Sequence, residues 1–322
     1  MEYKVLPGTG LQVSRLCLGT MTFGDQADFE ESEKILHACL DAGVNFIDTA
    51  DIYCKGESEK ILGKLLPGHR EELVIATKVG GPSGVGKNGS GLSRKHIIAS
   101  VENSLKRMNT DYTDILYCHF PDRKTPYQEI IATMNQLIRE GKIRYYGLSN
   151  FSAWQCCQII MLAREMNMEP PIVGEMVYNL LTRGIEDEFL PFSRAFDFGI
   201  AVYNPLAGGL LTGKHLPDKA AAGSRFDREE GYRRRYWNDS NFRAMESLTR
   251  VAEETGISLL ELSFRWLLNH PEVTSVISGA SKAEQIRQNL GFFDGKELPA
   301  KAFADCDEAW KQIRGEYFSY HR

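Results

Sequence analysis

The sequence predicts an α/β fold, a single (β/α)8 barrel across all 322 residues, and three observations lead to this prediction. Short apolar segments rich in β-branched residues alternate with segments of helical periodicity along the whole chain, a pattern typical of a parallel sheet. No linker interrupts this alternation. Polar or ionisable residues end several of the strand-like segments, and a parallel barrel builds its active site at the carboxyl ends of its strands.

The first half of the chain contains a predicted hairpin followed by five strand–helix units. The hairpin spans residues 3–14 and turns around Gly8-Thr9-Gly10. Gly43 ends the first helix and Ser93 caps the third, as glycine and serine do at these positions. The strands are expected at 16–19, 44–48, 73–78, 114–119 and 142–149. The helices that follow them are expected at 30–41, 58–66, 93–108, 127–140 and 153–168.

The second half continues the pattern with three more units. A long loop rich in Gly, Pro, Arg and Asp is expected at 207–239, after the seventh strand. Helices at 241–255 and 301–313 are additions to the barrel. The strands are expected at 171–177, 200–204 and 273–277, and the helices that follow them at 187–196, 258–269 and 281–290.

Composition excludes several classes of protein. With 43% hydrophobic residues, 25% charged residues and a formal net charge of −5, the chain is typical of a globular protein that does not bind nucleic acid. The Arg triplet at 233–235 is interpreted as a solvated loop. The seven cysteines are odd in number and form no CxxC pair, which indicates a reducing, cytoplasmic compartment. We expect neither a signal peptide nor a membrane span, since no apolar run approaches the roughly 20 residues needed.

Residues 81–88 look like a phosphate-binding P-loop but differ from one in two respects. Asn88 occupies the position after Lys87 where that motif needs Ser or Thr to hold magnesium. The stretch Gly89-Ser90-Gly91 would break the helix that a P-loop leads into. The glycines also satisfy GxGxxG, which does not open a helix here. This segment is therefore predicted to be a flexible loop on the active-site face.

Four residues, Asp48, Tyr53, Lys78 and His119, form the candidate catalytic set, and three of them end predicted strands. A phenol with an ordinary pKa near 10 gives up its proton poorly at neutral pH, and an ammonium group beside it would lower that pKa. Lys78 could supply this charge, Asp48 could hold Lys78, and His119 could orient a carbonyl oxygen. No Ser or Cys with a base beside it is present as a nucleophile. An external hydride therefore fits this site best.

Seven segments carry a resemblance to a known family: residues 18–24 (LGTMTFG), 43–53 (GVNFIDTADIY), 76–78 (ATK), 118–122 (CHFPD), 141–150 (GKIRYYGLSN), 203–206 (YNPL) and 279–285 (GASKAEQ). In these segments the chain resembles the aldo-keto reductase family, in order and over almost its whole length. The resemblance implies a (β/α)8 TIM barrel, reduction of aldehydes and ketones with a nicotinamide cofactor, usually NADPH, and no metal. It also implies that Asp48, Tyr53, Lys78 and His119 are the catalytic tetrad, with Tyr53 as the proton donor.

The resemblance also implies cofactor contacts along the carboxyl ends of the strands. Ser149 and Asn150 would hold the carboxamide, and Tyr203 would stack on the nicotinamide ring. Residues from 204 to 214 would follow the pyrophosphate, and those from 279 to 289 the adenosine phosphate. The positions concerned are Thr20, Asp48, Ser149, Asn150, Glu175, Tyr203, Asn204, Leu206, Gly208, Lys214, Arg225, Gly279, Ser281, Gln285 and Asn289.

Two positions depart from the commonest family residues. Glu175 stands where a Gln usually meets the carboxamide, and a carboxylate there would accept but not donate a hydrogen bond. Its negative charge would favour the oxidised, cationic ring, unless Glu175 is protonated or faces outward. Gln285 stands where many members place an Arg against the 2′-phosphate. Lys282 or Arg225 could supply that charge, so NADPH is favoured and NADH is the alternative.

Two other functions compete with carbonyl reduction. One is a cofactor-binding, redox-sensing regulatory subunit that resembles the potassium-channel β subunits, a branch of the family that also carries Gln at the position of Gln285. The other is an aldolase that forms a Schiff base through Lys78. The expected small-molecule substrate is a carbonyl compound or an alcohol, whose identity the sequence does not predict. Aromatic residues expected at the pocket mouth are Phe23, Phe120, Tyr232 and Trp237.

Overall fold

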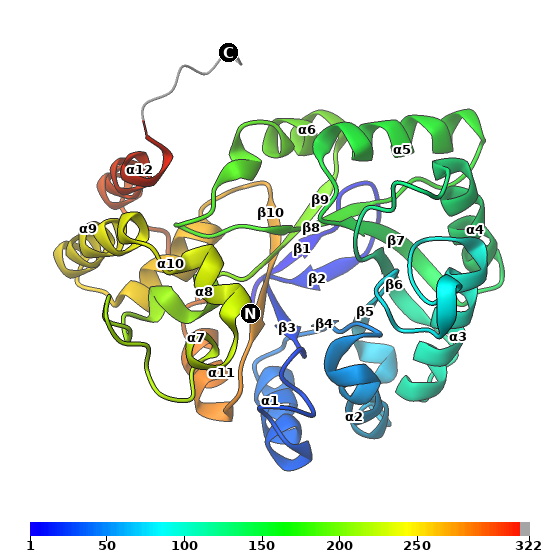
Figure 1. The fold of residues 1–322 in the computed structure, drawn as a ribbon, viewed down its shortest axis with the longest axis horizontal. Helices are drawn as coiled ribbons and strands as arrows, with labels where there is room; N and C mark the ends of the chain where they lie inside the picture. The colour runs from blue at the N-terminus through cyan, green and yellow to red at the C-terminus, as the bar shows by residue number, and fades with distance from the viewer. Residues whose placement is uncertain (316–322) are drawn as a thin grey trace.

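Eight parallel strands close into a barrel in the computed structural model, which describes residues 1–315 (Figure 1). Neighbouring strands follow the chain order, and the last strand pairs with the first. The predicted (β/α)8 barrel is thereby confirmed. The strands are β3 (Leu16–Gly19), β4 (Phe46–Asp48), β5 (Val74–Val79), β6 (Thr113–Cys118), β7 (Ile143–Ser149), β8 (Val173–Val177), β9 (Gly199–Tyr203) and β10 (Val273–Gly279).

Helices surround the barrel because each connects the end of one strand to the start of the next. The predicted Ser93 cap is confirmed, since its hydroxyl accepts a hydrogen bond from the backbone of His96. The helices between strands include α1 (Phe29–Asp41), α2 (Glu57–Leu65), α3 (Arg94–Met108), α4 (Tyr127–Arg139), α5 (Ala153–Glu165), α6 (Phe189–Phe196) and α10 (Leu259–Leu268), and α11 (Ala283–Leu290) follows β10. Short 3₁₀ turns are η1 (Tyr53–Gly56), η2 (Arg70–Glu72), η3 (Gly86–Asn88), η4 (Gly184–Glu186) and η5 (Ala207–Thr212).

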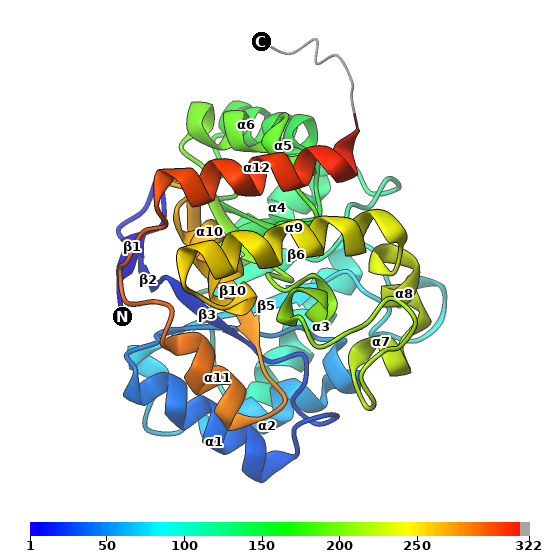
Figure 2. The same cartoon turned by 90° about the vertical axis from the view of Figure 1, so that its left-hand side faces the viewer.

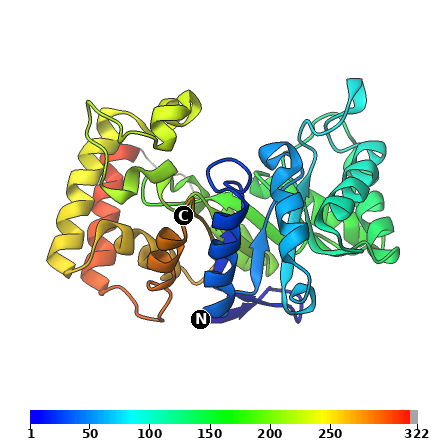
Figure 3. The ribbon, with the colours of Figure 1, turned by 90° about the horizontal axis from the view of Figure 1, so that it is seen from below.

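The two additional helices predicted from the sequence are present and pack together. They are α9 (Asp239–Thr255) and α12 (Ala300–Arg314), which lie side by side on the outside of the barrel (Figure 2). The N-terminal hairpin is also confirmed as β1 (Tyr3–Val5) and β2 (Gln12–Ser14), paired antiparallel. Leu6 and Val13 of the hairpin segment join the core inside the barrel. The hairpin therefore closes the end of the barrel opposite the candidate site (Figure 3).

The prediction of an unstructured loop at 207–239 was wrong in part. This segment contains η5 and two short helices, α7 (Arg225–Arg228) and α8 (Glu230–Tyr236). Phe226 is buried at 1% exposure and contacts the rings of His215 and Trp237. This aromatic cluster supplies the apolar contacts that hold short helices in place, since short isolated helices are marginal in water. The many Gly and charged residues of this segment led to the prediction of a loop, and composition alone does not reveal the aromatic cluster.

The Arg triplet at 233–235 also differs from its interpretation as a loop, because it lies on α8. Arg234 forms an exposed ion pair with Glu230 at 2.7 Å, and Arg233 lies over the Trp237 ring. Arg235 lines the main cavity. Residues 81–88, by contrast, form a loop as predicted, apart from the short turn η3 at its end. Gly84 donates a backbone hydrogen bond to Gly89, and the next α-helix begins only at Arg94.

The interior of the barrel is packed tightly around Tyr117 of β6. Gly147 on the neighbouring strand β7 lets the Tyr117 ring lie directly against its backbone. A Cβ atom built on Gly147 would lie 2.5 Å from a ring carbon of Tyr117 and 2.7 Å from the carbonyl oxygen of Val173. A side chain at this position would therefore have to push apart a buried ring and a strand.

We predict that Gly147→Ala lowers the free energy of unfolding by about 1–3 kcal/mol, the usual cost of overpacking a core. Gly231→Ala on α8 is the matched control, because no atom lies within 4 Å of its Cβ position and its backbone is compatible with alanine. The control is expected to be neutral or slightly stabilising. Urea denaturation followed by circular dichroism measures both, and equal stability of the two variants would contradict this account of the barrel interior.

Candidate active site

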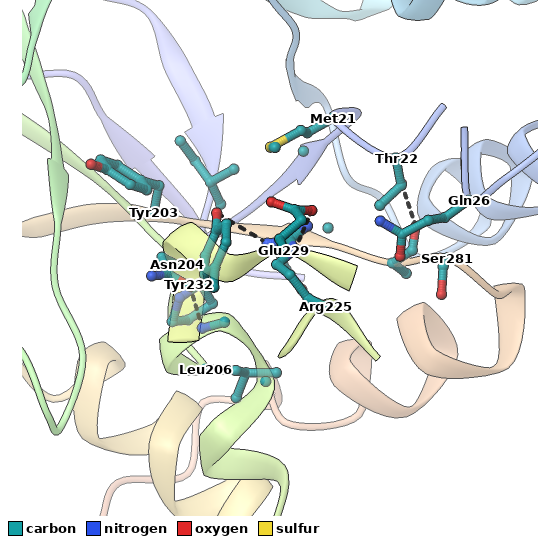
Figure 4. Close-up of a pocket in the computed structure, with 18 of the residues that line it drawn as sticks. Met21, Thr22, Gln26, Tyr203, Asn204, Leu206, Arg225, Glu229, Tyr232 and Ser281 are labelled. Atoms are coloured by element: carbon teal, nitrogen blue, oxygen red, sulfur yellow. Dashed lines mark hydrogen bonds and ion pairs between the residues drawn. The ribbon is translucent and has the colours of Figure 1, made fainter. Parts of the chain in front are cut away.

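A cavity of about 1810 Å³ opens at the carboxyl ends of the strands. Its walls come from β3, β4, β8, β9 and β10, the loop after β3, and η5, α7 and α8. Figure 3 shows α7 and α8 at the end of the barrel opposite the hairpin, and Figure 4 shows side chains of this cavity. Small-molecule pockets usually measure about 300–1,000 Å³, so this one has room for a large ligand together with a small one.

Lys78 brings three of the four predicted catalytic residues together at the floor of the cavity. Its ammonium Nζ donates to the Asp48 carboxylate, and it lies 3.1 Å from the Tyr53 hydroxyl. It also donates to the backbone oxygen of Thr49 at 3.0 Å. Lys78 itself is fully buried and lies behind the cavity wall, whereas Asp48 and Tyr53 line the cavity. His119 borders the same space, with its ring centroid 6.0 Å from that of Tyr53.

A strained turn positions Tyr53. After β4 the chain enters η1, where Cys54 and Lys55 have positive φ angles of 46° and 58°. Non-glycine residues seldom adopt this conformation, and consecutive examples are concentrated at functional sites. Gly56 follows with φ 87° before α2 begins. The turn directs the Tyr53 hydroxyl back toward Lys78 of the neighbouring strand, which explains why Tyr53 lies outside any strand and still joins the cluster.

Burial outweighs the ammonium group in setting the acidity of Tyr53. We expected Lys78 to lower the pKa of this phenol. Burial instead raises the pKa of Tyr53 above its usual value, and the Asp48 and Glu175 carboxyls add to the increase, against the opposing effect of Lys78. Burial lowers the pKa of Lys78, but Asp48 and Glu175 outweigh it and hold that pKa well above the usual value. A protonated phenol and a charged ammonium are therefore the stable forms.

His119 is neutral in this environment. Burial, with a further effect of the Lys78 charge, lowers its pKa to about 3. Its ring stacks on Phe120 at a centroid distance of 4.2 Å, and its Nδ1 is buried without a hydrogen-bond partner. A neutral imidazole can donate one hydrogen bond to a carbonyl oxygen without competing with Tyr53 for the proton.

Glu175 faces inward and contacts the same lysine. Its Oε2 lies 3.4 Å from Lys78 Nζ but makes no hydrogen bond there, and the residue is only 4% exposed. Burial and the negative charge of Asp48 together raise its pKa to about 8, against the opposing effect of Lys78. Of the alternatives that the sequence left open for Glu175, an outward-facing side chain is excluded by its burial, and a protonated carboxyl fits its raised pKa better than a charged one. At neutral pH the carboxyl is mostly protonated, because two buried carboxylates compete for one ammonium group.

Most predicted cofactor positions border the cavity, but two do not. Thr20 is fully buried, and its hydroxyl contacts the backbone oxygen of Asp48 and the hydroxyl of Ser58. Ser149 is buried behind Asn150, whose amide group donates to its hydroxyl. The predicted positions that line the cavity are Asp48, Asn150, Glu175, Tyr203, Asn204, Leu206, Gly208, Lys214, Arg225, Gly279, Ser281, Gln285 and Asn289.

Hydrogen bonds hold the side chains of the middle of the cavity in place. Asn150 accepts from the Tyr203 hydroxyl at 2.7 Å and donates to the backbone oxygen of His119 at 3.1 Å. Asn204 donates to the Tyr236 hydroxyl of α8 and accepts from the backbone of Gly208. This network fixes the Tyr203 ring at the cavity wall and ties β9 to the segment that follows it.

A second group of polar residues surrounds the far end of the cavity. Gln285 accepts from the backbone and the hydroxyl of Ser281 at 3.0 and 3.3 Å. Arg225 lies 3.8 Å from Glu229 and donates to the Tyr232 hydroxyl (Figure 4). Lys282 lies outside the cavity lining and is 4.0 Å from Glu31. Of the two cations proposed from the sequence, Arg225 is thus the one that reaches the cavity.

The site has unsatisfied polar groups that a bound ligand could meet. Within residues 1–315, the buried atoms Asp48 Oδ1, His119 Nδ1 and Glu175 Oε2 have no hydrogen-bond partner, and all three residues line the cavity. Buried polar atoms without partners are rare, and each needs an explanation such as a catalytic role or a bound ligand, water or ion. Together with the Tyr203 ring and the cationic far end, these atoms fit the carboxamide, ring and phosphates of a nicotinamide dinucleotide.

The sequence missed several residues that line the cavity, because they come from loops and helices whose positions depend on the whole fold. The prediction for the pocket mouth was right for Phe120 and Tyr232, which line the cavity. It was wrong for Phe23 and Trp237, because Phe23 is fully buried in the outer core and Trp237 packs in the aromatic cluster below α7. Lining residues that were not predicted include Met21, Thr22, Gln26, Glu229, Arg235 and Gln288.

No group of three or more His, Cys, Asp or Glu side chains in residues 1–315 is arranged to hold a metal ion. No helix in the same residues is long and apolar enough to cross a membrane.

Comparison with known proteins adds a family and several relatives. The model of the Aldo/keto reductase family matches residues 15–311. The chain is 40% identical over 321 residues to a probable voltage-gated potassium channel subunit beta of Oryza sativa subsp. japonica, covering 98% of each chain. It is 33% identical over 320 residues to the L-glyceraldehyde 3-phosphate reductase of Escherichia coli (96% of this chain, 92% of the relative).

An uncharacterized oxidoreductase of Bacillus subtilis, YrpG, is 36% identical over 303 residues and covers 90% of each chain. Since the family match at residues 15–311 includes every barrel strand and every wall of the cavity, the chain belongs to the aldo/keto reductase family.

Proposed function

We propose that this chain is an NADPH-dependent oxidoreductase that interconverts an aldehyde or ketone and an alcohol by hydride transfer. One observation carries the proposal: Lys78 Nζ contacts both the Asp48 carboxylate and the Tyr53 hydroxyl at the floor of a large cavity. This cluster can supply a proton and stabilise the phenolate that remains, but it contains no nucleophile. A redox cofactor bound in the cavity would supply the missing hydride.

In the proposed mechanism, Tyr53 gives its proton to the carbonyl oxygen as hydride reaches the carbonyl carbon. Lys78 stabilises the developing phenolate from 3.1 Å, and Asp48 keeps Lys78 oriented and charged. Neutral His119 donates a hydrogen bond to the substrate oxygen and directs it toward Tyr53. The raised pKa of Tyr53 keeps the donor protonated until the substrate accepts the proton.

The proposed cofactor site follows the polar groups along the cavity. Asn150 and Glu175 would meet the carboxamide, and the Tyr203 ring would lie on the nicotinamide. Lys214 and the backbone near Gly208 would face the pyrophosphate, whose negative charge a cation stabilises. The remaining predicted residues at the far end, from Gly279 to Asn289, would surround the adenosine.

NADPH is preferred over NADH in this proposal because Arg225 reaches the cavity. Gln285 offers hydrogen bonds but no charge, and Lys282 lies outside the lining. Arg225 is only 23% exposed and its ion pair with Glu229 is long, at 3.8 Å. Its guanidinium therefore has capacity to bind a phosphate in bidentate fashion.

A second candidate function is a cofactor-binding regulatory subunit. It is favoured by the 40% identity to proteins of rice and Arabidopsis thaliana named as probable voltage-gated potassium channel subunits beta. Both functions use the same cofactor site, so they differ in kinetics rather than in ligand. An enzyme turns over many times with excess NADPH, whereas a sensor retains its cofactor after a single oxidation.

The aldolase alternative is opposed by the surroundings of Lys78. A Schiff base needs a neutral amine that the substrate can reach. Lys78 is fully buried, forms an ion pair with Asp48, and has a raised pKa. These features fit a lysine that stays charged beside Tyr53 better than one that attacks a substrate as a neutral amine.

We predict that Tyr53→Phe lowers kcat for carbonyl reduction by about 10²–10⁴-fold, the usual contribution of a general acid. NADPH binding should be retained, because the ring of Tyr53 and the rest of the cavity remain. Tyr145→Phe is the control, since Tyr145 packs against the inner core and does not line the cavity. Steady-state kinetics over a panel of aldehydes and ketones measures the effect. Unchanged turnover in Tyr53→Phe would refute the mechanism.

We further predict that Arg225→Ala weakens NADPH binding by roughly 10- to 100-fold, as expected for a lost charged hydrogen bond of about 1.5–3 kcal/mol. NADH binding should change much less, because NADH lacks the 2′-phosphate. Lys282→Ala is the comparison, and it should leave the preference intact. Titration of intrinsic fluorescence with each cofactor gives the dissociation constants. A larger effect of Lys282→Ala would assign the phosphate contact to Lys282 instead.

A further inference from the structure

Two buried carboxyl groups share one ammonium group at the floor of the cavity. Lys78 Nζ contacts Asp48 directly and lies 3.4 Å from Glu175 Oε2. Asp48 has the better geometry, because it accepts a hydrogen bond from Lys78 and Glu175 does not. Asp48 is therefore the carboxylate that balances the lysine charge, and Glu175 is the additional acid.

The other titratable groups that face Glu175 are neutral and supply no second positive charge. They lie on β3, η1, β6 and β9, and a negative charge on Glu175 would raise the pKa of each of them. Each of them prefers its protonated, uncharged form because burial raises its pKa. They are Cys17, Tyr53, Tyr117 and Tyr203. A buried carboxylate without a cation is costly, so Glu175 retains its proton until a positive charge comes close.

We propose that Glu175 is the proton reservoir of this site, protonated beside a reduced nicotinamide and ionised beside an oxidised one, with Lys78 as the route to Tyr53. This inference rests on the proposed function. It concerns a residue at which this chain departs from the Gln common in the family, and it gives that departure a chemical role.

The step balances in atoms, electrons and charge. A C–H bond of the reduced nicotinamide breaks, and its hydrogen and electron pair form a C–H bond on the carbonyl carbon. The O–H bond of Tyr53 breaks as the carbonyl oxygen takes the proton. Lys78 then gives a proton to the Tyr53 oxygen, and the Glu175 carboxyl returns one to Lys78. The products are an alcohol, a cationic nicotinamide ring and a Glu175 carboxylate.

The geometry suits this relay. Lys78 Nζ is 3.1 Å from Tyr53 Oη and 3.4 Å from Glu175 Oε2, and such contacts often shorten when substrates bind. Lys78 ends the step with the charge it had at the start. The positive charge of the oxidised ring is matched by the new negative charge of Glu175, so the buried site remains neutral overall. A Gln at this position would leave the oxidised ring beside Lys78 without a compensating charge.

The first expected result concerns protons released when NADP⁺ binds. At pH 7 Glu175 is mostly protonated, since its pKa is raised to about 8. Binding of NADP⁺ should then release up to roughly one proton, whereas binding of NADPH should release almost none. The release is measured with an indicator dye in weakly buffered solution, and it requires no turnover.

The second expected result is the pH dependence of affinity. Below pH 8 the dissociation constant of NADP⁺ should fall by up to about tenfold per pH unit, because the ionised form of Glu175 is the one that binds. Above the pKa of about 8 the affinity should level off. NADPH affinity should not rise with pH. Fluorescence titrations from pH 6 to pH 9.5 give both curves.

Two variants identify the source of the proton. Glu175→Gln keeps the shape and should remove both the proton release and the pH dependence of NADP⁺ affinity. Tyr53→Phe should keep both, because the carboxyl is intact. Release that persists in Glu175→Gln, or that disappears in Tyr53→Phe, would assign the proton to another group and overturn the inference.

The outcomes separate this inference from the proposed function. Carbonyl reduction with no proton release on NADP⁺ binding would leave the enzyme proposal standing and remove the reservoir. Failure of the wild-type chain to bind either nicotinamide dinucleotide would remove both.

Discussion

The ion pair between Lys78 and Asp48, buried inside the barrel, is the interaction on which the candidate site depends. Placing a charged lysine in a core is costly unless it is paired and its remaining protons are bonded. Here the Asp48 carboxylate, the backbone oxygen of Thr49 and the Tyr53 hydroxyl accept hydrogen bonds from the Lys78 ammonium group. The barrel makes this arrangement possible because β4 and β5 are neighbours in parallel register, with the two side chains close to the same edge.

Burial has the largest effect on the protonation state of each group around Lys78, and the positive charge of Lys78 modifies that effect. It opposes the rise in the pKa of Tyr53, adds to the depression of the pKa of His119, and leaves Glu175 as a second acid with no cation of its own. The site therefore contains a protonated phenol (Tyr53), a neutral imidazole (His119) and a protonated carboxyl group (Glu175). This combination suits a reaction in which a proton and a hydride are delivered together and a positive charge develops on the cofactor.

The barrel and most of the candidate catalytic residues could be predicted from the sequence, because the apolar runs of the strands and the polar residues that end them can be recognised in it. Asp48 and Lys78 end apolar runs, and parallel strands bring such ends to one face. The acidity of Tyr53 and Glu175 could not be predicted, since it depends on burial and on neighbours from other strands. The burial of Phe23, the packing of Trp237 against Phe226 and the short helices α7 and α8 were missed for the same reason, because each depends on how the folded chain packs.

The central claim is that hydride passes from a bound nicotinamide to a carbonyl carbon above Tyr53. A single-turnover reaction with NADPH deuterated at the hydride-bearing carbon tests it most directly. The account predicts that one face of the dihydronicotinamide transfers deuterium to the carbonyl carbon of the product. It also predicts a slower chemical step with that label than with unlabelled NADPH. Product formed without deuterium at that carbon, or label lost to water, would contradict it.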